Sequence, residues 1–74
     1  MGTVSKALSL LTNFNQSRTE IGLSEIARLA GVNKATAYRL LIELQEGGFV
    51  EQTGPDKMWR LGPEILRLAR LREA

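Results

Sequence analysis

The sequence contains no cysteine and no histidine. Without them the chain has no disulfide, no thiolate nucleophile, no ordinary zinc ligand set and no imidazole for acid–base chemistry. What remains for catalysis is serine and threonine hydroxyls beside carboxylates, a set too generic to indicate an active site. We therefore expect a protein that is not an enzyme and that needs no cofactor or metal.

Long apolar runs are also missing, and so is a strong charge of either sign. No stretch approaches the roughly 20 apolar residues of a membrane span, and the first residues lack the charged start and apolar centre of an export signal. We therefore expect no membrane contact and a cytoplasmic location. Ten Lys and Arg against eight Asp and Glu leave a net charge of +2. That is too small to indicate a polyanion-binding protein by itself, so the distribution of charge has to decide.

Length sets a further limit. A chain of 74 residues buries a modest share of its surface and is marginally stable alone. The pattern at its C-terminal end is helical up to Ala74, without a glycine or a capping residue. We therefore expect one small domain, residues 1–62, followed by residues 63–74 as the start of a helix that continues in a longer protein.

Residues 23–42 carry the strongest pattern in the chain. Apolar residues at helical spacing predict two helices that face each other, with Ile26, Ala27 and Ala30 on the first and Ala37, Leu40, Leu41 and Leu44 on the second. Gly31 lies between them, where a sharp turn requires a residue that tolerates positive φ. Ala27 is small enough to keep the contact between the helices close. The spacing predicts a helix-turn-helix.

The second of these helices, residues 33–46, presents the candidate contact residues. Asn33 is a good N-cap, and no acidic residue occurs between Glu25 and Glu43. The outward residues of the first two turns are Lys34, Ala35, Thr36, Tyr38 and Arg39. A charge, a hydroxyl donor and a small residue beside free amides at a helix N-terminus suit an approach to phosphates and base edges.

Several of these side chains have more than one expected role. Arg39 can fork onto a guanine or bind a phosphate, and Tyr38 can donate to a phosphate or lie against sugar and thymine methyl. In the preceding helix Ser24 is the expected N-cap, and Arg28 either pairs with Glu25 or contacts phosphate. Solvated surface is the alternative for each contact residue.

A β-hairpin is predicted over residues 49–61, because β-prone residues flank a Gly-Pro-Asp-Lys turn. Trp59 and Leu61 share one face by alternation and are expected to close over the core. Stacking of Trp59 on a base is the weaker alternative in a chain with so few aromatic residues. Lys57 at the tip and Arg60 on the other face are the charges that a wing would lay along the DNA backbone or minor groove, with solvated surface as the alternative.

The flanking helices complete the pattern. Thr3 is expected to cap a first helix that turns Val4, Ala7, Leu8, Leu11 and Phe14 toward the core. Pro63 suits the first turn of a last helix, where its missing N–H costs nothing. This last helix is apolar over a broad arc that holds Ile65, Leu66, Leu68, Ala69 and Leu71. We expect part of this arc to meet another chain or a following domain.

Four segments together resemble the N-terminal DNA-binding domain of the IclR family of bacterial transcriptional regulators. They are SKALSLL from Ser5, GLSEIARLAGVNKATAYRLLIEL from Gly22, GGFVEQ from Gly47 and WRLGPEIL from Trp59. The resemblance implies a mainly α fold with a small β-hairpin, which is a winged helix-turn-helix with a three-helix core, a two-stranded wing and a C-terminal linker helix. It also implies a dimeric or tetrameric repressor or activator whose small-molecule effector binds through an absent C-terminal domain.

Two functions from different classes follow. The first is sequence-specific binding of a near-palindromic double-stranded operator by a homodimer, with the recognition helix 33–46 in the major groove and the wing 49–61 on the backbone or minor groove. The second is a winged helix used only to dock another protein. For the first, the candidate DNA-binding residues are Ser24, Arg28, Asn33, Lys34, Ala35, Thr36, Tyr38, Arg39, Lys57 and Arg60.

Overall fold

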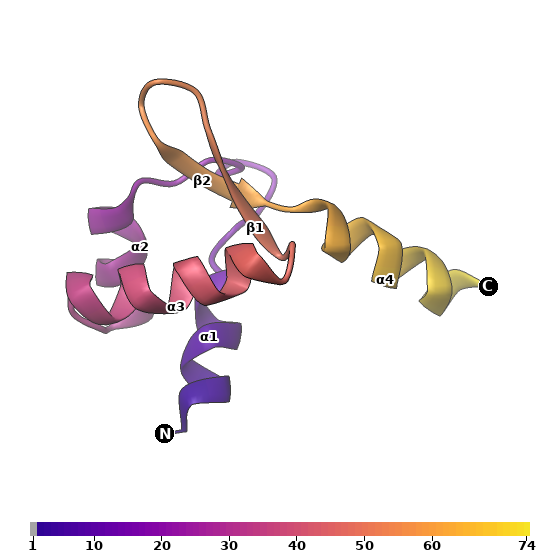
Figure 1. The fold of residues 1–74 in the computed structure, drawn as a ribbon, viewed down its shortest axis with the longest axis horizontal. Helices are drawn as coiled ribbons and strands as arrows, with labels where there is room; N and C mark the ends of the chain where they lie inside the picture. Colours follow the sequence, from indigo (N-terminus) through magenta and orange to yellow (C-terminus); the bar gives the residue numbers. More distant parts are fainter. Residues whose placement is uncertain (1) are drawn as a thin grey trace.

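A computed structural model describes residues 2–74, which form four helices and a two-stranded hairpin (Figure 1). In chain order the elements are α1 (Thr3–Leu11), α2 (Leu23–Ala30), α3 (Lys34–Glu46), β1 (Val50–Thr53), β2 (Met58–Leu61) and α4 (Pro63–Glu73). The first three helices pack against one another, whereas α4 extends away from this body (Figure 1). The predicted winged helix-turn-helix is confirmed.

The turn between α2 and α3 follows the sequence prediction. Gly31 ends α2 with φ +71°, in the left-handed region that glycine adopts without steric cost. Its N–H donates to the carbonyl of Arg28 at 3.3 Å. Asn33 then caps α3, because its Oδ1 accepts from the N–H of Thr36 at 2.8 Å. The position of α3 relative to α2 is therefore set by a glycine turn and a side-chain cap.

The hairpin is held to the helices through its second strand. β1 and β2 are antiparallel, and Glu51 lies opposite Arg60. On its other side β2 bonds to the segment before α2, because Ile21 and Trp59 exchange two backbone hydrogen bonds of 2.9 Å. The segment before α2 thus pairs with the hairpin through an isolated β-bridge.

One apolar core lies between the first three helices and the hairpin. Its fully or almost fully buried members are Leu10, Ile21, Ile26, Leu40, Leu41, Val50 and Trp59. Ala27 and Ala37 are also buried, on facing helices, as the close crossing of α2 and α3 requires. Trp59 is the largest of these side chains and is 1% exposed. Its predicted core role is confirmed.

Two of the predicted helix caps are wrong. Thr3 is the first residue of α1, and Gly2 precedes it as the cap without a side-chain hydrogen bond. Ser24 is the second residue of α2, which Gly22 caps in the same way. The pairing of Ile21 with Trp59 fixes where the chain leaves its extended conformation, so α2 begins before the residue with the best capping side chain.

The core-facing stripe predicted for α1 is partly wrong. Val4 and Leu8 are 72% and 54% exposed, and Leu10 is the buried residue of this helix. At 100° per residue, Val4 and Leu8 lie about 120° and 160° from Leu10 around the helix axis, so the face of α1 that packs on the core is turned away from them. Leu61 is also more exposed than expected, at 39%. It lies at the end of β2, beyond the point where Ile21 pairs with that strand.

The C-terminal helix joins the body through backbone contacts. Gly62 donates to the carbonyl of Phe49 at 2.8 Å, and the N–H of Glu64 donates to the carbonyl of Gly48 at 3.0 Å. The Arg67 guanidinium donates to the Glu64 carboxylate and lowers the pKa of that carboxyl from its usual value. No residue of α4 is buried. Across residues 2–74, no helix is long and apolar enough to span a membrane.

Candidate nucleic-acid interface

The outward face of α3 displays the predicted contact residues of this helix. Lys34, Ala35, Tyr38 and Arg39 are exposed, and Thr36 is half-buried. The opposite face carries Ala37, Leu40 and Leu41, which are buried against the core. Because a helix advances 100° per residue, Ala35 and Arg39 lie at the centre of the outward stripe, with Tyr38 on one flank and Thr36 on the other.

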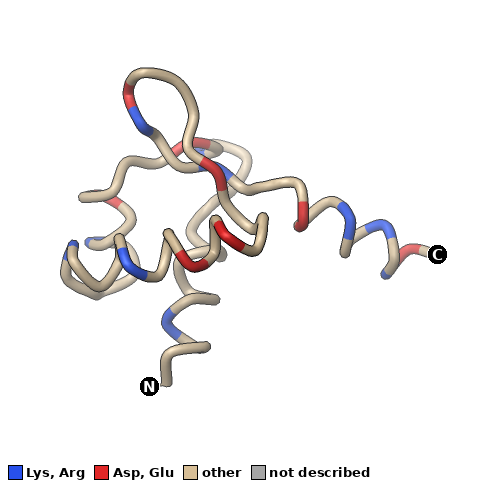
Figure 2. The backbone as a smooth tube through the Cα atoms, viewed as in Figure 1, with Lys and Arg blue, Asp and Glu red and all other residues tan. Residues whose placement is uncertain are grey.

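The charges of α3 run against the usual preference of helices. Acidic residues stabilise helix N-termini and basic residues stabilise C-termini, each by about 0.3 to 1 kcal/mol. α2 and α4 follow this rule, since both have a glutamate in the first turn and arginine in the last turn. α3 has neither, and instead begins with Lys34 and ends with Glu43 and Glu46 (Figure 2). The positive end of the helix dipole and the positive side chains therefore coincide at one exposed end of α3.

Asn33 holds the structure of this end of the helix. Its side-chain oxygen accepts a hydrogen bond from the N–H of Thr36. A direct contact of Asn33 with DNA would therefore use its side-chain NH2 group as a donor, and its other contribution is to cap the helix. The Thr36 hydroxyl has no intramolecular hydrogen bond within residues 2–74. It is therefore available as a donor.

The two candidate residues of α2, Ser24 and Arg28, are exposed. They belong to a different helix from the candidate residues of α3. Arg28 donates to Glu25 at 3.4 Å, which is the weak one-turn pair that was one of its two expected roles. Its side chain remains 69% exposed, and Ser24 is exposed as well. Such a solvated pair is worth little and does not prevent Arg28 from turning to a phosphate.

The two predicted cations of the wing differ in their surroundings. Lys57 is exposed at the tip and has φ +55°, a left-handed conformation that is uncommon outside glycine. Arg60 donates through Nε to Glu51 at 2.7 Å, and its Nη2 lies 2.6 Å from the same carboxylate oxygen. Glu51 was not among the predicted site residues, although the cross-strand register that places it opposite Arg60 follows from a symmetric hairpin.

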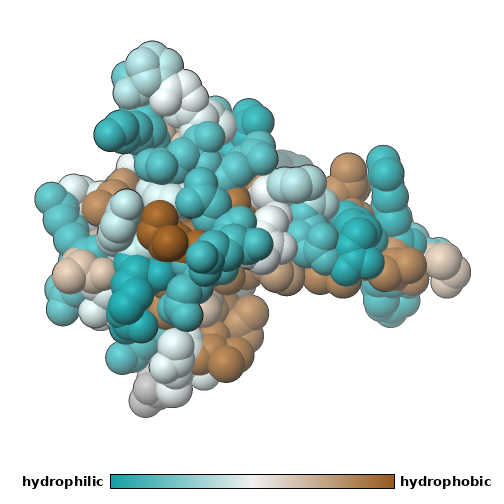
Figure 3. Space-filling model, in the orientation of Figure 1, coloured by the Kyte–Doolittle hydropathy of each residue, from teal (hydrophilic) through white to brown (hydrophobic). Residues whose placement is uncertain are grey.

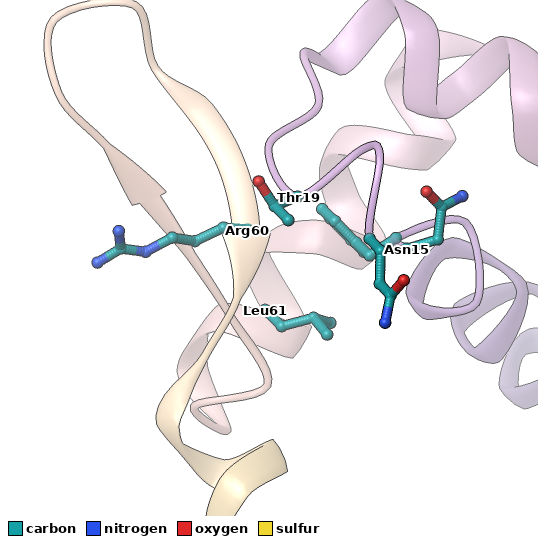
Figure 4. A pocket seen from close by; sticks show the side chains of 6 residues that line it. Asn15, Thr19, Arg60 and Leu61 are labelled. Atoms are coloured by element: carbon teal, nitrogen blue, oxygen red, sulfur yellow. The ribbon is translucent and has the colours of Figure 1, made fainter.

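A hollow of about 380 Å³ lies between β2 and the loop that follows α1. Phe14 and Leu61 line it together with polar loop residues, and the Arg60 side chain points away from it (Figure 4). The hollow explains the exposure of Leu61. Most of the surface that lines the hollow is apolar, so it is a poor candidate for binding a polyanion, and α3 and the wing remain the candidate nucleic-acid interface.

A helix-turn-helix whose second helix exposes its basic residues toward its N-terminal end, followed by a two-stranded wing, defines the class of winged-helix DNA-binding domains. The comparisons with known proteins agree: residues 3–54 match the sequence profile described as the IclR helix-turn-helix domain. The chain belongs to the IclR family, and it carries the DNA-binding domain of a transcriptional regulator.

The relatives are longer proteins of the same kind. The chain is 34% identical to the HTH-type transcriptional regulator XynR of Escherichia coli over 86% of its own length and 25% of that protein. It is 38% identical to the glycerol operon regulatory protein of Streptomyces coelicolor over 89% of its length and 26% of that protein. The chain thus spans about a quarter of the curated relatives it matches.

Solved structures extend the likeness to the whole fold. The crystal structure of an IclR transcriptional regulator from a Silicibacter species superposes with a TM-score of 0.93 at 67% identity, over 97% of this chain and 28% of that one. An IclR homolog from Microbacterium hydrocarbonoxydans, solved in complex with 4-hydroxybenzoate, gives a TM-score of 0.84 at 30% identity, over 97% of this chain and 32% of that one. The predicted family membership is confirmed.

Proposed function

We propose that this domain binds a specific double-stranded operator as part of a symmetric homodimer. In this proposal α3 enters the major groove with its N-terminal end first, and the wing lies along the backbone or the minor groove. Two such helices would read half-sites about one helical turn apart, roughly 34 Å, so the operator would be a near palindrome.

The observation that carries the proposal is the reversed charge order of α3. A helix with Lys34 at its start and glutamates at its end is less stable than one with the opposite order. The arrangement is understandable if the positive end serves to meet an anion. DNA phosphates are such an anion, and helix N-terminal amides bind them favourably.

The proposed contacts fall into two groups. Lys34, Thr36 and the tip residue Lys57 are proposed to bind phosphates, which supply affinity on any sequence. Arg39, at the centre of the outward stripe, is proposed to read a base edge, with Ala35 leaving room for the approach and Tyr38 against the backbone or a thymine methyl. Ser24, Arg28 and Arg60 are proposed as peripheral backbone contacts.

The partner in the homodimer is proposed to cover the apolar side of α4. Leu66, Leu68 and Leu71 are 54%, 42% and 62% exposed, and hydrophobic atoms follow this helix along its length (Figure 3). These leucines are spread over a broad arc of the helix, and exposed apolar surface of this breadth marks an association surface. We further propose that α4 leads, as the start of a linker, into an effector-binding domain that takes a small metabolite, and that the whole protein acts in the cytoplasm as a repressor or an activator.

Binding to random-sequence duplex tests the proposal against the docking alternative. The 74-residue chain is expected to bind with an affinity that falls linearly on a logarithmic scale with salt, by a slope of about −0.9 for each phosphate neutralised. Fluorescence anisotropy at several salt concentrations measures the slope. Affinity that is absent at low salt, or independent of salt, would favour a module that docks a protein.

Selection of bound sequences from a random duplex pool tests the symmetry. We expect enrichment of two inverted half-sites whose centres are roughly 10 base pairs apart, because a twofold dimer presents its recognition helices in that relation. Enrichment of one unpaired half-site would show that the domain binds as a monomer. The best selected duplex also serves as the specific probe in the experiments below.

A further inference from the structure

The side chain of Arg39 forms an ion pair with the carboxylate of Glu43, one turn further along α3. Its Nη1 lies 3.8 Å from Oε2 of Glu43, and the two side chains are 63% and 62% exposed. Within residues 2–74, Lys34 has no such ion pair, so the two cations of this helix differ. Arg39 is therefore the one of these two cations that has a carboxylate beside it.

Helix stability is a poor explanation for this pair. A one-turn ion pair supports a helix best when the acid precedes the base, and here the arginine comes first. Glu43 also stands on the exposed flank of a helix that otherwise gathers positive charge toward its start (Figure 2). A carboxylate at this place repels phosphates, which weakens binding to any duplex unless it also serves selection.

We propose that Glu43 is a specificity-determining residue that orients Arg39 toward base edges and penalises its contact with phosphates. The proposal deepens the function proposed above and rests on it. In a specific complex the guanidinium stays beside the Glu43 carboxylate and uses its N–H groups as a fork on two acceptors of a base, such as N7 and O6 of guanine.

In a non-specific complex the same guanidinium would have to swing to a phosphate. That motion gives up the contact with Glu43 and leaves the carboxylate near the DNA backbone with its charge uncompensated. Because phosphates are present on every sequence and the paired acceptors are not, the penalty falls mainly on wrong sites. Glu43 therefore lowers non-specific binding more than specific binding.

The test compares Glu43→Gln with wild type on two probes, a random-sequence duplex and the best duplex selected by the wild-type chain. We expect the affinity for the random duplex to rise roughly threefold to tenfold, as for removal of one like charge near phosphates. The affinity for the selected duplex should change less than about twofold, so the ratio of the two falls. Both side chains are exposed, and circular dichroism checks that the fold is kept.

Two further variants separate orientation from net charge. Glu46→Gln makes the same charge change at an exposed position that has no ion pair with Arg39 in the described chain, and it should raise both affinities alike. In an Arg39→Ala background, Glu43→Gln should no longer alter the ratio. An effect that persists there, or that Glu46→Gln reproduces, would overturn the proposal.

The failure of this inference is distinguishable from that of the proposed function. If wild type binds duplex in a salt-sensitive manner and Glu43→Gln leaves the ratio of affinities unchanged, the role of Glu43 is wrong and the DNA-binding proposal stands. If wild type shows no salt-sensitive binding, both are overturned together.

Discussion

Replacing Arg39 with alanine is expected to weaken binding to the selected duplex by roughly fivefold to 150-fold while the melting temperature stays almost unchanged. The loss corresponds to the about 1 to 3 kcal/mol that a good bidentate base contact contributes. The fold has little to lose, because Arg39 is 63% exposed and its charge partner is the solvated Glu43. Exposed one-turn pairs contribute about 0.3 to 0.5 kcal/mol to stability.

The salt dependence of this variant decides between the two roles open to Arg39. If Arg39 reads a base, the loss is confined to the selected sequence and the slope against salt is kept. If it binds a phosphate, all duplexes lose affinity about equally and the slope changes by about one unit. Arg72→Ala, on the far end of α4, is the matched control for loss of one exposed arginine. A drop of several degrees in melting temperature for Arg39→Ala would show instead that this side chain supports the core.

The elements that local physics determines were predictable from the sequence. α3 was placed with Asn33 as its cap and Glu46 as its last residue, because an Asx cap and a glycine pair mark the ends and the apolar period marks the face. The outward direction of Lys34 and Arg39 follows from the same period. The β-hairpin predicted over residues 49–61 was also correct, since a Gly-Pro turn leaves few registers for a hairpin.

The sequence predictions fail where contacts between residues far apart in the sequence determine the local structure. Ser24 has the better capping side chain, yet the bridge from Ile21 to Trp59 starts α2 earlier. Leu8 fits the apolar period of α1, yet the helix packs on the core through the face that carries Leu10 and leaves Leu8 54% exposed. The pair of Arg39 with Glu43 is local, and its four-residue spacing is visible in the sequence. It was nevertheless not predicted, because only the basic and polar residues of this helix were considered as DNA contacts.

Replacing Gly62 with alanine is expected to destabilise the domain by about 3 kcal/mol, the upper end of what overpacking usually costs. A Cβ atom built on Gly62 would lie 2.4 Å from the carbonyl oxygen of Gly48 and 3.0 Å from the N–H nitrogen of Val50. Both neighbours are backbone, which cannot move aside as a flexible side chain can. The backbone of Gly62 itself is extended, with φ −96°, so the requirement is for space and not for conformation.

The measurement is thermal unfolding followed by circular dichroism. For a domain of this size, 3 kcal/mol corresponds to a fall of roughly 12 to 24 °C in melting temperature. Gly22→Ala is the matched control: Gly22 also precedes a helix with extended backbone, but its added Cβ would meet Met58 Sδ at 3.6 Å, an ordinary contact. The control should lose no more than about 1 kcal/mol, the cost of a poorer N-cap. Equal melting temperatures for the two variants would contradict the close packing at Gly62.

The loss of DNA affinity in Arg39→Ala and the loss of stability in Gly62→Ala should be independent of each other, because the two residues lie in different parts of the chain. Gly62 holds α4 to the turn that follows α3, through the bonds from Gly62 to Phe49 and from Glu64 to Gly48. Below its melting temperature, Gly62→Ala should therefore keep most of its affinity for DNA, since the exposed face of α3 is untouched. Arg39→Ala should show the converse, full stability with reduced affinity. If Gly62→Ala also loses specific binding while folded, the seating of α4 controls the recognition helix, and this glycine contact is a route by which a following domain acts on DNA binding.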